Sequence, residues 1–185
     1  MTDKASASLV RLMQASHVAT LEELPDMIRS HAAAVGMHEA AVFVVDLRET
    51  VLRRLTGRGK NAGAGGEEFT VQGSLPGQAY QRVALLAEQD RASSRTGRWR
   101  WWVTITDGVE RIGVLRTDTD SDDEGTCQDV LDLASLTALL LLSKRSFSDS
   151  YARLVRTEPM NVAAEMQWHL TPRPPSPDVT RLSER

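Results

Sequence analysis

Acidic residues gather between two predicted elements of this sequence and could bind a cation. They are Asp118, Asp120, Asp122, Asp123 and Glu124. A calcium loop of the EF-hand kind needs glycine at its sixth position and glutamate at its twelfth. Counting from Asp118, those positions hold Asp123 and Asp129. We therefore interpret the stretch as a solvated turn that precedes a helix.

A glycine-rich stretch, residues 57–66, contains the pair Gly59-Lys60, which could belong to a phosphate-binding loop. A Walker loop needs a glycine five residues before that glycine and a serine or threonine after the lysine. Arg54 and Asn61 occupy those places, so the motif fails. We expect a mobile loop that covers a pocket.

Metal-ligating and nucleophilic side chains are sparse. The histidines are His17, His31, His38 and His169, and none has another at helical ligand spacing. We therefore expect no metal site. Cys127 is the single cysteine and has no evident base partner, so it cannot form an internal disulfide and should pack at a helix start.

Arginines alternate with tryptophans between residues 91 and 102, a pattern that could stack nucleic-acid bases. Successive residues of a strand point to opposite faces. One face would then carry Trp99, Trp101, Val103 and Ile105, and the other Arg100, Trp102 and Thr104. With 22 basic and 25 acidic residues the chain lacks the basic excess of nucleic-acid binders. We expect core tryptophans and no nucleic-acid partner.

The elements that must position these residues follow from hydrophobic periodicity. A capping box begins at Thr20, Gly36 stops that helix, and Ser74 caps a short helix that has Pro76 in its first turn. The predicted helices are 5–16, 20–35, one starting at Ser74, 126–147 and 149–170. The predicted strands are 40–47, 51–55, 68–71, 84–87, 99–106 and 111–117, with the last two joined across Asp107-Gly108.

This order predicts an α+β fold, in which N-terminal helices and a long C-terminal helix flank an antiparallel sheet of five or six strands. The N-terminus lacks the apolar core of a signal peptide. The longest apolar run, 136–142, is far shorter than the roughly 20 residues of a membrane span. We expect a cytoplasmic protein without a membrane partner.

Three stretches resemble a GAF domain. Residues 41–46 with 51–55 are similar to its opening hairpin, residues 73–80 to its short helix beside the ligand pocket, and residues 102–108 with 111–115 to its paired central strands. The resemblance implies a sensory domain over residues 1–147 and a small-molecule ligand between sheet and short helix. The residues that could line this pocket are Phe43, Tyr80, Trp102 and Thr104. Alternatively, they close a ligand-free core; the ligand and any cofactor stay unknown.

Residues 156–172 resemble the linker that precedes SpoIIE-like (PPM-type) serine phosphatase domains, which act on phosphorylated regulators of sigma factors. This stretch includes Met160, Gln167 and Trp168. The resemblance implies a helical linker over 148–171. After Pro172 nothing resembles the metal-binding aspartates of those enzymes, so we expect no catalysis by this chain. The proline-rich tail 172–185 is expected to be disordered.

The long predicted helix has an apolar surface that is wider than a single stripe packed against the sheet, so the remainder needs a partner. The residues expected to meet a partner are Val130, Leu133, Thr137, Leu140 and Leu141, followed by Met160, Gln167 and Trp168 in the linker. We predict a parallel homodimer in which this helix and 5–16 form a bundle, and a regulatory module that tunes a phosphatase or an anti-sigma pathway protein. The alternatives are a ligand-free structural dimerisation domain and a truncated serine/threonine phosphatase.

Overall fold

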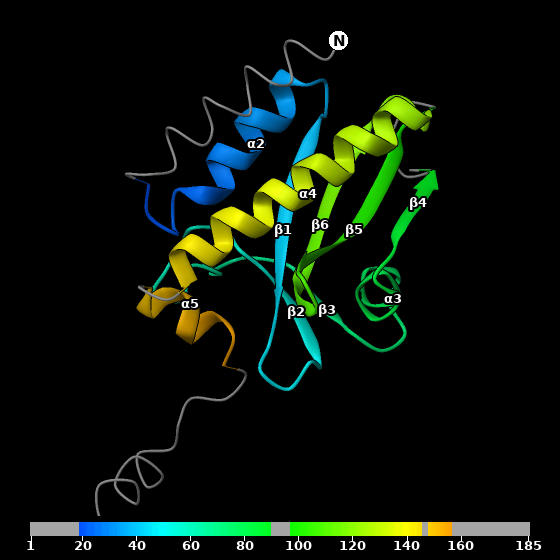
Figure 1. The fold of residues 1–185 in the computed structure, drawn as a ribbon. Helices are drawn as coiled ribbons and strands as arrows, with labels where there is room; N and C mark the ends of the chain where they lie inside the picture. The colour runs from blue at the N-terminus through cyan, green and yellow to red at the C-terminus, as the bar shows by residue number, and fades with distance from the viewer. Residues whose placement is uncertain (1–18, 90–96, 146–147, 157–185) are drawn as a thin grey trace, which may run out of the picture.

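The computed structural model describes residues 19–89, 97–145 and 148–156, and Figure 1 shows the elements that they form. The helices are α2 (Leu24–Ala34), α3 (Leu75–Arg82), α4 (Glu124–Arg145) and α5 (Asp149–Leu154). The strands are β1 (Glu39–Val45), β2 (Val51–Arg54), β3 (Glu68–Thr70), β4 (Leu85–Gln89), β5 (Trp99–Asp107) and β6 (Glu110–Thr119).

The six strands form one antiparallel sheet in the order β3-β2-β1-β6-β5-β4. The β5–β6 hairpin is confirmed, but its turn is Gly108-Val109, one residue later than predicted, because Asp107 still pairs with Glu110; Gly108 has the positive φ of 56°. The α+β class and the six-stranded alternative are therefore confirmed. The central strands β1 and β6 pair two hairpins that lie far apart in the sequence.

Helices cover both faces of the sheet. In Figure 1, α2 and α4 lie across one face, and α3 lies near the edge formed by β4 and β5. Strand β5 shows how the faces divide: Trp101, Val103 and Ile105 pack with α2 and α4, whereas Trp102 packs with the α3 residues Ala79 and Tyr80. The predicted alternation, and the predicted burial of Trp101 and Trp102 in the core, are confirmed.

The helix starts follow the predicted capping chemistry with one shift. The side chain of Glu23 accepts a hydrogen bond from the Thr20 backbone N–H (2.8 Å), which is one half of the expected capping box, and α2 begins at Leu24. At α3, the Ser74 hydroxyl accepts from the Gly77 N–H (3.0 Å), as predicted. These hydrogen bonds fix the residues at which α2 and α3 begin.

Helix α4 buries most of its apolar residues within one copy of the chain, which corrects the dimer surface that the sequence predicted. The five residues expected to meet a partner are all buried against the sheet and its neighbouring helices: Val130, Leu133, Thr137, Leu140 and Leu141. The exposed leucines of this helix are Leu131 (39%) and Leu139 (59%). By length and composition alone α4 could cross a membrane, but this burial accounts for its apolar character.

The glycine-rich loop also lies elsewhere than expected. Ala62 is fully buried in the α2–α4 core, and its carbonyl accepts hydrogen bonds from the N–H groups of Thr56 and Gly57. A side chain at Gly57 would collide with the carbonyl oxygen of Glu22. The loop therefore packs on the face of the sheet that α2 and α4 cover. It does not cover a pocket beside α3, which lies on the other face.

Helix α5 is shorter than the predicted helix 149–170, since it ends at Leu154, well before Pro159. Its start is capped by Ser148, whose hydroxyl accepts from the Tyr151 N–H (3.2 Å). Several predictions fall outside the described residues: helix 5–16, the linker beyond Arg156 with Met160, Gln167 and Trp168, and the tail 172–185.

Candidate functional site

The four residues predicted to line a pocket lie together on the face of the sheet that α3 covers. Phe43 and Tyr80 are fully buried, and Trp102 and Thr104 are buried as well. The rings of Phe43 and Trp102 lie 5.7 Å apart, and Phe69 of β3 contacts both at 5.2 and 5.5 Å. These contacts make an aromatic layer, which we call the aromatic floor (Phe43, Phe69 and Trp102).

The polar atoms of this group already have partners in the protein. The Trp102 indole N–H donates to Glu88 (3.1 Å), and the Thr104 hydroxyl donates to the Ala79 carbonyl (2.7 Å). The Tyr80 hydroxyl lies 3.5 Å from the carbonyl of Arg111. Thr104 and Tyr80 therefore anchor α3 to β5 and β6, which is the structural role that the sequence left open as the alternative.

On this face of the sheet, the pKa of Tyr80 is shifted strongly from its ordinary value. Burial, together with the nearby carboxylate of Glu49, raises the pKa of its phenol to about 12, although Arg111 over the ring opposes the shift. The phenol of Tyr80 is therefore neutral near pH 7, and Tyr80 acts as a buried packing residue.

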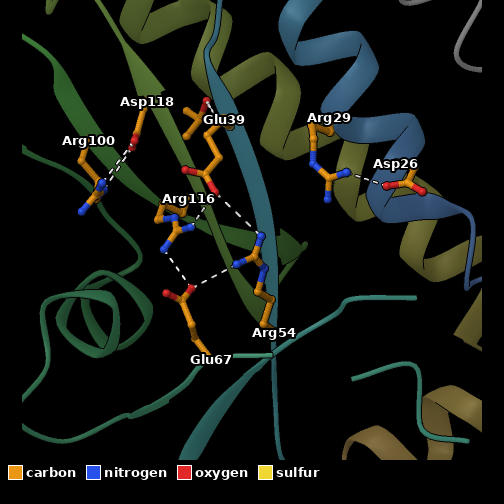
Figure 2. A network of polar contacts seen from close by, with 9 residues as sticks. Asp26, Arg29, Glu39, Arg54, Glu67, Arg100, Arg116 and Asp118 are labelled. Carbon is orange, nitrogen blue, oxygen red and sulfur yellow. Dashed lines mark hydrogen bonds and ion pairs between the residues drawn. The ribbon is translucent and has the colours of Figure 1, made fainter. Parts of the chain in front are cut away.

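Beside α3, two arginines and two glutamates on this face form a closed ring of ion pairs, which we call the charged ring (Glu39, Arg54, Glu67 and Arg116). Figure 2 shows the two guanidinium groups pointing toward the two carboxylates. Arg116 contacts Glu39 and Glu67 at 3.0 Å each. Arg54 contacts Glu67 at 3.3 Å and Glu39 at 3.8 Å. Each glutamate presents a single oxygen to both arginines, and the ring is neutral overall.

Arg116 is the buried member of the charged ring. Its side chain is only 8% exposed, whereas those of Glu39 and Glu67 are 41% and 49% exposed. The guanidinium lies over Phe43 and Trp102, at 5.7 and 5.8 Å from the ring centroids. Its Nε is buried without a hydrogen-bond partner. Arg116 is therefore a buried cation that lies on the aromatic floor and has one donor unmet.

Strand register brings the charged ring together. Arg116 is paired with Ala41 on β1 and with Trp102 on β5, so its side chain emerges between those strands on the α3 face. Arg116 was not predicted as a site residue because it lies in an otherwise apolar strand. The signal was present: two-residue alternation places Arg116 on the same face as Val114.

The acidic stretch is divided among structural roles. Asp118 accepts hydrogen bonds from the Nε and one terminal nitrogen of Arg100 (3.1 and 3.2 Å), and Asp120 pairs with His38 (2.7 Å). Asp123 caps α4 by accepting from the Thr126 N–H (2.8 Å), and hydrogen bonds from Ser121 and Thr126 lower its pKa. Within residues 19–89, 97–145 and 148–156, no cluster of three potential metal ligands occurs.

On the opposite face of the sheet, Arg53 binds the segment that follows α4, residues 149–156. Its guanidinium donates to the carbonyls of Leu154 (3.2 Å) and Arg156 (2.9 Å), and its Nε lies 3.2 Å from Glu68. The Leu47 N–H donates to the Val155 carbonyl (2.8 Å). We call residues 149–156 the exit segment. Its carbonyls are fixed to β2 and to the β1–β2 turn.

Comparisons with known proteins bear on the fold. The sequence matches no protein-family model and no curated protein. Solved structures with similar folds include the GAF domain of an Acinetobacter phosphoenolpyruvate-protein phosphotransferase, at 15% identity and a TM-score of 0.57, covering 75% of this chain and 93% of that one. The A. aeolicus nlh2 GAF domain in an inactive state has 12% identity and a TM-score of 0.61, covering 77% of this chain and 98% of that one.

A GAF domain of a Coxiella burnetii phosphoenolpyruvate-protein phosphotransferase has 13% identity and a TM-score of 0.61, covering 77% of this chain and 95% of that one. Identities this low establish a shared fold alone. The chain therefore has a GAF-like fold, and the predicted resemblance is confirmed at that level.

Proposed function

We propose that this chain is a non-catalytic sensory module, in which the α3 face receives a signal and the exit segment transmits it. The observation that carries the proposal is the arrangement of β2. Arg54 belongs to the charged ring, and its neighbour Arg53 fixes the exit segment on the other face. A change in the charged ring that moves β2 therefore also moves the groups that hold residues 154–156.

The fold supports this role. Solved structures of similar fold come from phosphoenolpyruvate-protein phosphotransferases and, at 12% identity and a TM-score of 0.57, from a methyl-accepting chemotaxis protein. By their names these proteins relay phosphoryl groups or chemical signals. A module of this fold in front of an output partner is the arrangement that we propose here.

The output that we propose is a SpoIIE-like serine phosphatase or an anti-sigma pathway protein. Its support is the resemblance of residues 156–172 to the linker of such phosphatases, and that stretch follows directly after the exit segment. The test is reconstitution: the purified chain is mixed with candidate phosphatases, and hydrolysis of a phosphoserine peptide is followed. We expect hydrolysis by the partner to change with the chain present. Manganese-dependent hydrolysis by the chain alone would overturn its non-catalytic role.

We further propose that the chain forms a homodimer through the outer surface of α4. Leu131 and Leu139 are exposed there, beside a groove of about 400 Å³ between α4 and the β4–β5 edge of the sheet. Exposed leucines two helical turns apart favour association, because burying a fully exposed leucine contributes roughly 1.5–3 kcal/mol and each of these two would contribute part of that. Light scattering at micromolar concentration is expected to give twice the chain mass, and a monomer would exclude this surface.

A ligand-free dimerisation domain is the second candidate. It is favoured by the internal hydrogen bonds of Trp102 and Thr104, which leave no polar group of the predicted pocket residues waiting for a ligand. Thermal unfolding in the presence of small metabolites separates the two functions, since a ligand that binds only the folded state raises the melting temperature. No shift with any charged metabolite would favour the structural role.

A further inference from the structure

We infer that Arg116 and Arg54 form a binding subsite for the carboxylate group of a small organic acid, and that Glu67 occupies this subsite as a built-in, displaceable carboxylate. This inference rests on the proposed sensory function of the α3 face. The geometry that carries it is the convergence of two guanidinium groups on one oxygen of Glu67, at 3.0 and 3.3 Å.

The two glutamates of the charged ring differ in their place in the sheet. Glu39 lies on the central strand β1, and its carbonyl accepts the Thr117 hydroxyl (2.6 Å). Glu67 precedes the short edge strand β3, and its side chain is 49% exposed. The Glu67 backbone is fixed by the Arg54 N–H, which donates to its carbonyl (3.0 Å). Rotation of the Glu67 side chain into solvent, with its backbone left in place, would break its contacts with Arg54 and Arg116 and free both guanidinium groups.

Charge defines what can replace Glu67. With that side chain in solvent, the two arginines face only Glu39, which leaves one uncompensated positive charge. The aromatic floor excludes water below Arg116 and strengthens its attraction for an anion. A single carboxylate restores neutrality and has the planar geometry that guanidinium groups bind.

Arg116 has hydrogen-bonding capacity that the charged ring leaves unused. Its two terminal nitrogens donate to Glu67 and Glu39 at 3.0 Å each, and its buried Nε has no acceptor. A donor left unmet in a buried place costs free energy. The Nε–H shares its edge of the guanidinium with the terminal nitrogen that binds Glu39, so a carboxylate in the place of Glu67 takes over the contacts with the other terminal nitrogen and with Arg54.

The inference is tested on the full chain by calorimetric titration with sodium acetate, benzoate and succinate, with phosphate and sulfate at matched ionic strength as the other oxyanions. Glu67→Gln removes the competing charge while keeping the shape of the side chain, and is expected to tighten carboxylate binding by about tenfold or more. The matched control is Glu68→Gln, because Glu68 faces the opposite side and pairs with Arg53. This control is expected to bind as the wild type does.

Arg54→Gln is the second variant, since Arg54 is more exposed than Arg116 and its loss disturbs the core less. It is expected to weaken carboxylate binding in the Glu67→Gln background. Equal affinities of Glu67→Gln and Glu68→Gln would overturn the inference, and so would a preference for phosphate or sulfate over all three carboxylates. Because binding is measured without any output partner, a failure here leaves the reconstitution test of the proposed function to stand or fall separately.

Discussion

Arg53 and Arg54 are consecutive residues of β2, and their guanidinium groups hold partners on opposite faces of the sheet. Arg54 contacts Glu67 in the charged ring, and Arg53 contacts Glu68 and the carbonyls of Leu154 and Arg156. The carboxylates that they pair with are also consecutive. Neither pair can shift along the sheet without moving the backbone that carries the other, so the charged ring and the exit segment share one short piece of chain.

The first prediction concerns the stability that the charged ring contributes. Arg116→Met removes the buried cation but keeps an apolar cover on the aromatic floor, and should lower the free energy of unfolding by about 1–2 kcal/mol. The loss stays moderate because the half-exposed Glu39 and Glu67 can be rehydrated. Urea denaturation measures it.

The control for Arg116→Met is Arg29→Gln, which breaks the exposed Arg29–Asp26 pair shown in Figure 2. That pair is solvated, so its loss should change the free energy of unfolding by less than about 0.5 kcal/mol. An Arg116→Met variant as stable as the wild type would mean that the charged ring contributes nothing to the fold.

The second prediction separates the two sides of α4. Leu133 is buried against the sheet, and Leu133→Ala should cost about 2–5 kcal/mol of unfolding free energy. Leu139 is 59% exposed, so Leu139→Ala should cost less than about 0.5 kcal/mol while weakening self-association. Chemical denaturation and light scattering of both variants check this. If Leu139→Ala leaves self-association unchanged, the dimer surface lies elsewhere.

The third prediction concerns the exit segment. Arg53→Gln removes two charge-assisted hydrogen bonds to the carbonyls of Leu154 and Arg156. Local opening should become more frequent by at least about tenfold, since the loss of even one such bond, at roughly 1.5 kcal/mol, gives that factor. Trypsin cleavage after Arg153 is therefore expected to accelerate in the native protein. Arg29→Gln, which breaks an exposed pair on α2 and leaves β2 intact, serves as the comparison and should be cleaved at the rate of the wild type.

The fourth prediction concerns alkaline pH. Tyr80 has a pKa of about 12 in the folded chain, against an ordinary value of 10.0, because it is buried near Glu49. Between these values the folded state keeps a proton that the unfolded state releases, so stability is lost as the pH rises from about 10 to 12. Tyr80→Phe should lose stability less steeply over that interval. Parallel slopes for the two proteins would contradict the assigned pKa; burial also raises the pKa of Tyr151, which should account for the slope left in the variant.

Periodicity and capping chemistry predicted most of the fold. The alternation along Trp99–Ile105 assigned Trp101 and Trp102 to opposite faces, and Ser74 marked the start of α3; both are confirmed. These signals are local, because they depend on strand geometry or on the first turn of a helix. They hold whatever the rest of the chain does.

What the sequence did not predict depends on contacts between distant residues. The leucines of α4 were assigned to a partner because no local rule says how much of a helix the sheet covers; β5, β6 and α2 cover far more than one seam. The glycine-rich loop was assigned to the wrong face for the same reason. The charged ring joins residues that are as far apart as Glu39 and Arg116, and only the pairing of β1 with β6 brings them together.

The measurement that tests the central claim most directly is hydrogen exchange in residues 149–156 of the Glu67→Gln variant, followed by mass spectrometry beside the wild type and Arg29→Gln. If the α3 face is coupled to the exit segment through β2, opening the charged ring should speed exchange in 149–156 by about threefold or more, and Arg29→Gln should leave it unchanged. Identical exchange in the exit segment of Glu67→Gln and the wild type would contradict a sensory role for this face.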